Sequence, residues 1–434
     1  MAIVLTKIDM GKKINFFVLL VIVIICLYSA SNYQELSSVI DSGDTAWMIV
    51  ASAFVLLMTP GLSFFYGGMV SKKNIISTML QSFIALGVVS ILWVLIGFSL
   101  AFGDSIGGII GNPLTYFAFN NVGLEPNSDF SSTIPFLLFA LFQLKFAIIT
   151  PALITGSFAG RVRFRSYILF MVLFSLLIYS PLAHMTWHPD GLFRNWGILD
   201  FAGGTVVHMS AGFAALAGAL FLGKRKEVAL SPANVPYVIL GTGLLWFGWF
   251  GFNAGSALGA NSDAVIAFAN TNIASATAMI TWIFYERMLG RKMSAVGACI
   301  GAVVGLVAIT PAAGFVNIGQ SMFIGFIAAI ISNYAIHLKN KSNVDDTLDV
   351  FPSHGVGGIV GMLLTAVFAK EVGLIYGETQ TFLYHLLGLL IVSVFCFFGS
   401  YLLYMFVDRV LTMRVRADQE ERGLDLSQHG EKLE

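Results

Sequence analysis

The sequence predicts an all-α membrane protein with eleven transmembrane helices. Of its 434 residues, 57% are hydrophobic and only 11% are charged, whereas a soluble domain carries about 25% charged residues. Eleven apolar stretches are about 20 residues long, enough to cross a hydrocarbon layer of about 30 Å. They lie near residues 45–70, 75–103, 132–159, 167–187, 201–222, 234–256, 264–285, 294–313, 319–337, 353–369 and 381–408.

Basic residues predict the orientation of these helices. They concentrate in every second connection, beginning with Lys72 and Lys73, and in the C-terminal tail, while the opposite connections carry only Arg194 and Lys370. By the positive-inside rule the basic side is cytoplasmic. We therefore expect the mature N-terminus outside and the C-terminus in the cytoplasm of a cell (inner) membrane protein.

Five helices followed by five of opposite orientation fit two inverted repeats plus a final helix, an arrangement that commonly places a substrate path between the halves. Residues 65–68 (FYGG) echo residues 252–255 (FNAG), which is weak support for such a repeat. The sequence alone leaves the symmetry open.

The first 30 residues resemble a secretory signal peptide. Lysines precede an apolar stretch from about residue 14 to residue 28, and small residues follow it. Tyr28 suits cleavage after Ala30 poorly, so an uncleaved first helix is the alternative. We divide the chain into a signal peptide (1–30), a membrane domain (31–409) and a cytoplasmic tail (410–434).

Several classes of function are excluded by composition and motif. The 24 basic and 24 acidic residues cancel and no long basic block occurs, so a nucleic acid is not an expected partner. Cys26, Cys299 and Cys396 lie in apolar stretches without metal-type spacing, as packing thiols do. A hydrolase using Ser256 and a histidine would need a Gly-x-Ser-x-Gly or zinc-binding string, which is absent. We expect no catalytic residues, metal or cofactor.

Ionisable residues inside or beside the spans are the first candidates for function, because a charge in the bilayer centre costs several kcal/mol. They are Lys145, Asp200, His208, Asp349 and His354. Two facing neutral imidazoles could relay a small polar solute, although each histidine alone is also explained by packing against a backbone carbonyl. Asp200 and Asp349 each precede a helix, so the leading interpretation is that both cap it.

Aromatic residues near the outer helix ends are the second group of candidates. Trp187 is suited to cation–π attraction, worth roughly 0.5 to 2 kcal/mol, but tryptophan at a membrane surface is usually an anchor. Phe142 and Phe146 are four residues apart and share one helical face, which ordinary packing also explains. Phe252 lies in a later span.

Five strings read together resemble the signature segments of the ammonium transporter, methylammonium permease and Rhesus family. The resemblance runs from about residue 45 to residue 430, and Trp187 favours the ammonium transporter branch. The strings are residues 60–68 (PGLSFFYGG), 146–152 (FAIITPA), 200–208 (DFAGGTVVH), 248–256 (GWFGFNAGS) and 354–359 (HGVGGI).

The resemblance implies a path for ammonium through the protein. Ammonium would be recruited as a cation, lose a proton at a gate and cross an apolar pore as ammonia. The implied residues are Trp187, Phe142, Ser256 and Asp200 for the outer site, Phe146 and Phe252 for the gate, and His208 and His354 for the pore. The resemblance also implies a homotrimer and a PII-type signal protein bound at the C-terminal tail.

Two residues depart from the pattern of the family. Lys145 directly precedes Phe146, where relatives usually have a small or uncharged residue, and it either modulates the vestibule or reaches water at the periphery. Gly160 replaces a common glutamate. Lys145 leaves a second hypothesis open, a sensor that binds ammonium with little conduction and that is followed by a signalling domain.

Overall fold

The computed structural model describes residues 2–27, 40–226 and 231–433. Within them, eleven helical segments are long and apolar enough to cross a membrane. Each overlaps one predicted stretch, so the predicted number and order of spans are confirmed. The segments are Ser42–Met69, Lys72–Phe102, Phe136–Phe158, Phe164–Asn195, Gly204–Leu222, Val235–Gly255, Ser262–Met288, Ala295–Ala312, Ile318–Lys341, Phe351–Phe368 and Thr379–Val410.

Several spans are single α-helices, and the others consist of consecutive α-helical, 3-10 or π-helical segments. The elements of the first five spans are α2 (Ser42–Met69), η1 (Lys72–Asn74), α3 (Ile75–Phe83), α4 (Ala85–Leu92), η2 (Trp93–Gly97), α5 (Phe98–Phe102), α6 (Phe136–Ile154), η4 (Thr155–Phe158), α7 (Phe164–Phe174), η5 (Ser175–Tyr179), α8 (Ser180–Trp187), α9 (Leu192–Asn195), η6 (Gly204–Met209) and α10 (Ser210–Leu222). Those of the rest are α11 (Val235–Gly255), α12 (Ser262–Met288), α13 (Ala295–Ile309), η7 (Thr310–Ala312), α14 (Ile318–Lys341), η8 (Phe351–Val356), α15 (Gly357–Phe368) and α16 (Thr379–Val410).

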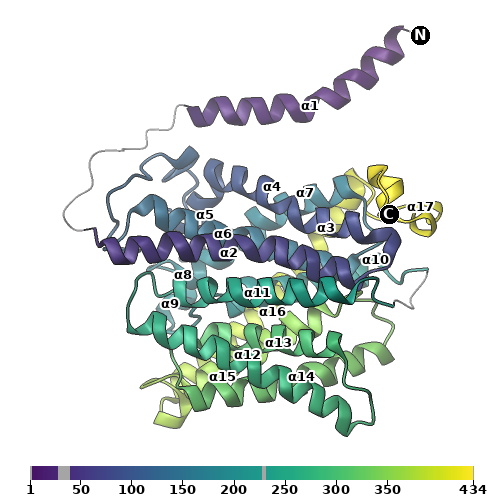
Figure 1. The fold of residues 1–434 in the computed structure, drawn as a ribbon. Helices are drawn as coiled ribbons and strands as arrows, with labels where there is room; N and C mark the ends of the chain where they lie inside the picture. Colours follow the sequence, from purple (N-terminus) through teal and green to yellow (C-terminus); the bar gives the residue numbers. More distant parts are fainter. Residues whose placement is uncertain (1, 28–39, 227–230, 434) are drawn as a thin grey trace.

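The spans form one bundle whose two ends differ (Figure 1). α2 packs along α11, and α12 packs against α13 and α14. The end with α9 also carries a connection with short strands β1 (Ser105–Ile106) and β2 (Ile110–Gly111) and the turn η3 (Phe117–Phe119). The opposite end carries α17 (Ala417–Arg422) and η10 (Asp425–His429).

The N-terminal helix α1 (Ala2–Leu27) lies along the outside of the bundle in Figure 1 and contacts η2 and η3. Its apolar part, Asn15–Leu27, is shorter than a membrane span. The predicted cleavage point after Ala30 lies outside the described residues, so the signal peptide stays a prediction.

Asp200 holds the start of the half-helix that carries His208. Its carboxylate accepts the backbone N–H groups of Gly203 (2.8 Å), Gly204 (2.7 Å) and Thr205 (2.8 Å). These donors have no partner within the helix, so the carboxylate satisfies them. The capping role expected for Asp200 agrees with this geometry.

The matching helix start before His354 is held by Asp346, and the expectation that Asp349 caps it is wrong. The Asp346 carboxylate accepts the backbone N–H of Phe351 (2.7 Å). Asp349 has a left-handed backbone (φ 57°) and pairs with Lys339 at 2.6 Å. Its carboxylate is therefore committed to the lysine instead of the helix start.

The two capping aspartates support the predicted repeat. Asp346 stands eight residues before His354, as Asp200 stands eight residues before His208. Each carboxylate accepts the N–H group five residues ahead. Equal spacing with equal bonding in the two halves is what two related five-helix units followed by a final helix produce.

The helices that carry the histidines touch backbone to backbone. A Cβ atom on Gly212 of α10 would lie 2.3 Å from the Gly355 nitrogen of η8, where no side chain fits. Small residues permit such close helix approach inside membranes. The two halves thus meet beside the histidine pair without intervening side chains.

The C-terminal tail folds back onto the connection before α3 of its own chain. The Asp425 carboxylate accepts the N–H groups of Ile76 (3.1 Å) and Ser77 (2.7 Å) at the start of α3. Asn74 supplies the acceptor for the Leu424 N–H (2.8 Å). The tail therefore caps the second span.

Candidate functional site

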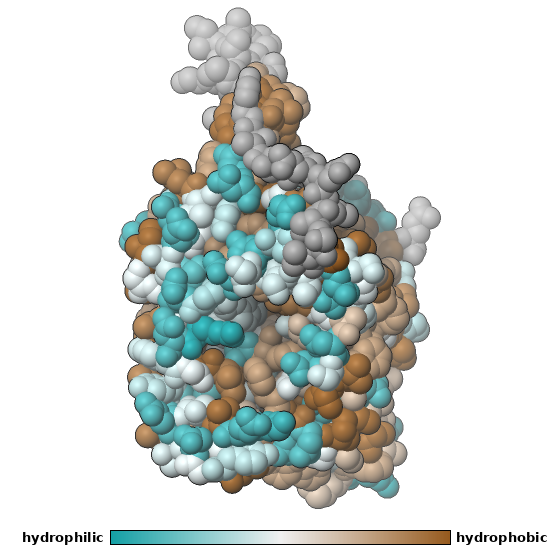
Figure 2. Space-filling view, turned by 90° about the vertical axis from the view of Figure 1, so that its left-hand side faces the viewer, coloured by the Kyte–Doolittle hydropathy of each residue, from teal (hydrophilic) through white to brown (hydrophobic). Residues whose placement is uncertain are grey.

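A cavity of about 450 Å³ opens at the bundle end that carries α9. Figure 2 looks onto this end and shows polar side chains around a hollowed middle. Four of the predicted site residues line the cavity: Trp187, Asp200, Ser256 and Phe146. The structure thus brings together residues from the third and fourth spans, from the connection before the fifth span and from the end of the sixth.

Trp187 is held in place by Asp200. Its indole Nε1–H donates to the backbone carbonyl of Asp200 (3.1 Å), and its ring meets Phe146 edge-on at 5.8 Å between centroids. The Asp200 carboxylate is occupied by backbone donors. Asp200 therefore organises the aromatic wall through its backbone carbonyl, while its carboxylate holds the helix start.

The hydroxyl of Ser256 is available as an acceptor in the same cavity. Its Oγ donates to the Phe252 carbonyl (2.9 Å), which commits its only proton and leaves its lone pairs for a donor. A cation with N–H groups matches this combination of an aromatic face and a hydroxyl acceptor.

Phe142 does not line the cavity. It lies so close to Gly255 that a Cβ atom added there would be 2.8 Å from its ring, and it packs edge-on against Phe146 at 5.0 Å between centroids. The neighbouring Gln143 lines the cavity instead. Sequence reasoning missed Gln143 because only ionisable residues inside spans were considered, although a lone amide in an apolar helix was a usable signal.

Two phenylalanine rings in tilted contact close the floor of the cavity. The rings of Phe146 and Phe252 lie 4.2 Å apart between centroids with an interplanar angle of 38°. Both side chains are fully buried. Phe252 in turn stacks near His208 at 6.0 Å, so the pair separates the outer cavity from the histidines.

The two histidines face each other directly below these rings. His208 Nδ1 and His354 Nδ1 lie 3.3 Å apart, and both residues are buried. Trp249 stacks on His208 at 5.3 Å and an interplanar angle of 21°. The sequence did not single out Trp249 as a site residue, since a tryptophan within an apolar span has no spacing to other residues that would distinguish it from a packing residue.

A second, very small cavity continues the path below His354. Its volume is about 10 Å³ and its lining includes His354, Ser353, Tyr66 and Phe65. A space of this size holds about one water-sized molecule. The large cavity, the Phe146–Phe252 pair, the two histidines and the small cavity therefore follow one another from the bundle end with α9 towards the opposite end.

Lys145 faces away from this path. At about 100° per residue, its side chain leaves α6 about 130° from the mean direction of the lining residues Phe139, Gln143 and Phe146. It shares a partly exposed face with Leu141, one turn earlier. The geometry favours the alternative in which the lysine lies at the periphery of the subunit.

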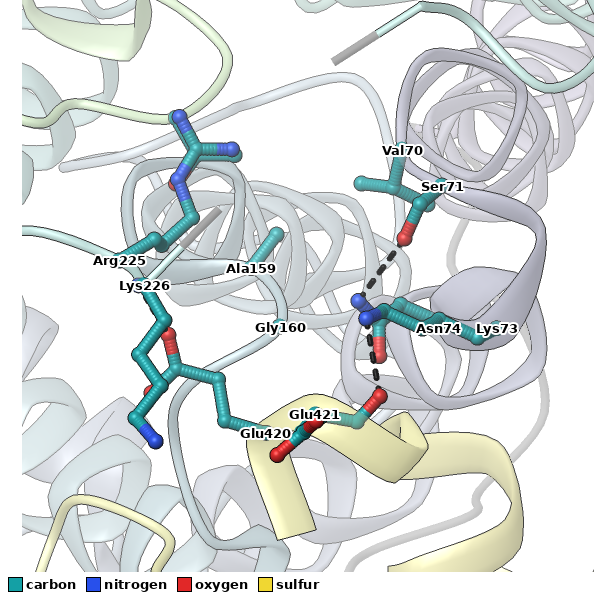
Figure 3. Close-up of a pocket in the computed structure, with 11 residues that line it drawn as sticks. Val70, Ser71, Lys73, Asn74, Ala159, Gly160, Arg225, Lys226, Glu420 and Glu421 are labelled. Carbon is teal, nitrogen blue, oxygen red and sulfur yellow. Dashed lines mark hydrogen bonds between the residues drawn. The ribbon is translucent and has the colours of Figure 1, made fainter. Parts of the chain in front are cut away.

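A third cavity, of about 260 Å³, lies at the bundle end that carries α17 and contains none of the predicted site residues. Figure 3 shows its lining, in which Asn74 donates to Ser71 Oγ (3.1 Å) and Lys73 donates to the Glu421 carbonyl (3.0 Å). Gly160 forms part of the wall with a left-handed φ of 82°. A glycine suits this backbone conformation, which penalises a side chain.

Within the described ranges, no group of three or more histidine, cysteine, aspartate or glutamate side chains is placed to hold a metal.

Comparison with known proteins identifies the class of molecule that has this geometry. The family model described as the Ammonium Transporter Family matches residues 46–433. An ammonium transporter of Aquifex aeolicus is 47% identical and covers 94% of this chain and 97% of its own. An ammonium transporter of Bacillus subtilis is 45% identical, with 90% and 98% covered.

Solved structures agree with the sequence relatives. The crystal structure of Saccharomyces cerevisiae Mep2 matches with a TM-score of 0.83 and 35% identity, covering 88% of this chain and 89% of the other. A structure named as a sensor Amt protein matches with a TM-score of 0.82 and 30% identity, covering 89% and 98%. The family consists of transporters, not enzymes, and the chain described here belongs to the Ammonium Transporter Family.

Proposed function

We propose that the protein carries ammonium across the membrane along the path from the outer cavity to the histidine pair. The observation that supports this most is the position of the Phe146–Phe252 pair between a cation-compatible cavity and two facing histidines. Relatives that are 45–47% identical are named ammonium transporters. A closed aromatic gate above a polar pair is suited to a small solute that becomes uncharged.

The physical chemistry of the path sets the order of events. Ammonium is recruited as a cation by the Trp187 face, the Ser256 hydroxyl and the field of Asp200, with Phe142 supporting the gate from behind. An apolar constriction penalises a bare cation heavily, so ammonium loses its proton at the gate and ammonia crosses between the histidines. The released proton crosses by a separate hydrated path that converges on the histidines, so each ammonium carries a net positive charge across the membrane. Potassium has a similar charge but no proton to lose, and is excluded.

The arrangement in the cell follows from the same proposal. The outer cavity faces outside and the tail faces the cytoplasm of the inner membrane, as the basic connections predict. Residues 1–30 act as a signal peptide ahead of the membrane domain (31–409). Three copies assemble into a homotrimer with one pore each, and the tail (410–434) is the contact for a PII-type signal protein.

A current measurement tests transport directly. Purified protein in liposomes on a supported membrane is expected to give a saturable, ammonium-evoked current and none with potassium. The variant His208→Ala removes one pore imidazole and should change the current. His337→Ala removes a histidine on α14 outside the path and serves as the matched control. Absence of any ammonium-evoked current in the unmodified protein would refute transport.

The sensor hypothesis is the second candidate, because one similar structure is named as a sensor Amt protein. Under this hypothesis the purified protein binds ammonium at the outer cavity but gives no current. Binding measured by calorimetry on the same preparation separates the two functions, since a transporter shows both signals.

A further inference from the structure

The hydroxyl of Thr310, the first residue of η7, makes three contacts beside the histidine pair. Its Oγ1 donates to the Leu306 carbonyl (2.8 Å), and it accepts the indole N–H of Trp249 (2.9 Å). His208 Nε2 lies 3.4 Å away. The four residues that supply these groups, Thr310, Leu306, Trp249 and His208, are all buried.

The number of protons in this cluster limits the possible arrangements. A hydroxyl has one proton and two acceptor positions. The Thr310 proton is committed to Leu306, and the Trp249 indole is only a donor. The remaining lone pair of Oγ1 can therefore only accept, and His208 Nε2 must carry the proton of this contact.

The tautomer of the second histidine follows from the first. A neutral His208 protonated at Nε2 has a bare Nδ1. The 3.3 Å contact between the two Nδ1 atoms then needs a proton from His354, because two bare nitrogens repel each other. His354 is consequently protonated at Nδ1, and its Nε2 is the nitrogen of the pair left to accept a proton.

We propose that Thr310 is a positioning residue that fixes both histidines in these tautomers and so gives the pair a direction. This inference rests on the proposed function of the pair as the pore. The free acceptor is His354 Nε2, and His354 lines the small cavity on the cytoplasmic side. An ammonia molecule that leaves the gate thus meets a pair whose acceptor position lies at its inner end.

The chain offers a matched control in the other half of the molecule. Thr150 also begins a Thr-Pro-Ala string and donates to the carbonyl four residues earlier, that of Phe146 (2.7 Å). In the described part of the chain its hydroxyl bonds to neither histidine. Thr150→Val therefore removes the same local hydrogen bond without touching the proposed relay.

Solid-state NMR of full-length protein in lipid membranes, labelled with ¹⁵N-histidine, reads the tautomers directly. The His208 and His354 signals are assigned by their loss in His208→Asn and His354→Asn. We expect one tautomer for each ring in the unmodified protein, in Thr310→Ser and in Thr150→Val. In Thr310→Val, which keeps the shape but loses the hydroxyl, the preference should fall by about five-fold, the equivalent of one net hydrogen bond.

The result that overturns the inference is an unchanged single tautomer in Thr310→Val, or a mixture in the unmodified protein. Currents recorded on the same variants separate this outcome from failure of the proposed function. Fixed tautomers released by Thr310→Val in a protein without current would support the role of Thr310 and refute transport. A normal current with tautomers that do not respond to Thr310→Val would support transport and refute the role of Thr310.

Discussion

The same substitution, aspartate to asparagine, should destabilise the protein at one helix start, that of Asp200, and not at the other, that of Asp346. The Asp200 carboxylate accepts from Gly203, Gly204 and Thr205 with both oxygens. In Asp200→Asn one oxygen becomes an NH₂ group that faces the Thr205 donors. Loss of two hydrogen bonds to a charged acceptor costs about 3 to 6 kcal/mol of unfolding free energy.

Asp346 is the contrasting case. One of its oxygens accepts from Phe351, while Oδ1 has no hydrogen-bond partner among the described residues. Burial and the nearby charge of Asp349 raise the pKa of Asp346 to about 6. Asp346→Asn places its NH₂ at the free position and removes a buried charge, so we expect no loss of stability at pH 7.

The contribution of Asp346 to the free energy of unfolding depends on pH, and the direction of this dependence follows from its raised pKa. Because the pKa is higher in the folded protein, the folded state binds more protons between about pH 4 and pH 6, and stability falls as the pH rises through this window. A shift of about two units corresponds to about 3 kcal/mol. Asp346→Asn should lose this dependence, whereas Asp200→Asn should retain it.

Thermal unfolding midpoints of the detergent-solubilised variants measure both effects. At pH 7, Asp200→Asn should lower the midpoint by about 5 °C or more, and Asp346→Asn should leave it equal or higher. An equal fall in the midpoint for the two variants would refute this reasoning. It would mean that the lack of a hydrogen-bond partner at Asp346 Oδ1 does not affect how well asparagine is tolerated.

Three further predictions concern the outer path and the tail. Lys145→Met should leave the ammonium current unchanged, because the side chain faces away from the cavity; an increase would show that the lysine throttles the pore. Trp187→Leu loses the aromatic face and the indole bond to Asp200, so the half-saturating ammonium concentration should rise by about ten-fold in current titrations; an unchanged value would eliminate the recruitment site. Gly160→Glu forces a side chain onto a left-handed backbone at a cost of about 1 to 2 kcal/mol, 2.9 Å from the Asn74 amide; limited proteolysis should cut the tail faster than in the unmodified protein.

The spans could be predicted because hydrophobic length and charge placement are properties of the sequence itself. The site could be predicted only where a residue type carries its own signal, as His208 and His354 do. The direction of Lys145 could not, because it depends on which face of α6 meets the cavity. Asp346 was missed in favour of the nearer Asp349, although the eight-residue spacing from aspartate to histidine was present in both halves.

The contacts that His208 and Trp249 both make with Thr310 Oγ1 could not be predicted from the sequence either. Thr310 lies 102 residues from His208 in the chain and 61 from Trp249. No local pattern links these positions, since their meeting is a product of how α13, η6 and α11 pack. Gln143 differs, because its polarity within an apolar helix was visible and only its direction was hidden.

Because Gly212 and Gly355 meet backbone to backbone, substitutions at this contact should affect the histidine pair differently from substitutions in the cavity walls. The main chain, not the surrounding side chains, sets how far apart the two imidazoles stand. Substitutions in the cavity walls can therefore change the affinity for the solute, or the size of solute that is admitted, while the distance between the two imidazoles stays the same. A single methyl group at Gly212 would instead lie 2.3 Å from the Gly355 nitrogen and push the two helices, and with them the imidazoles, apart.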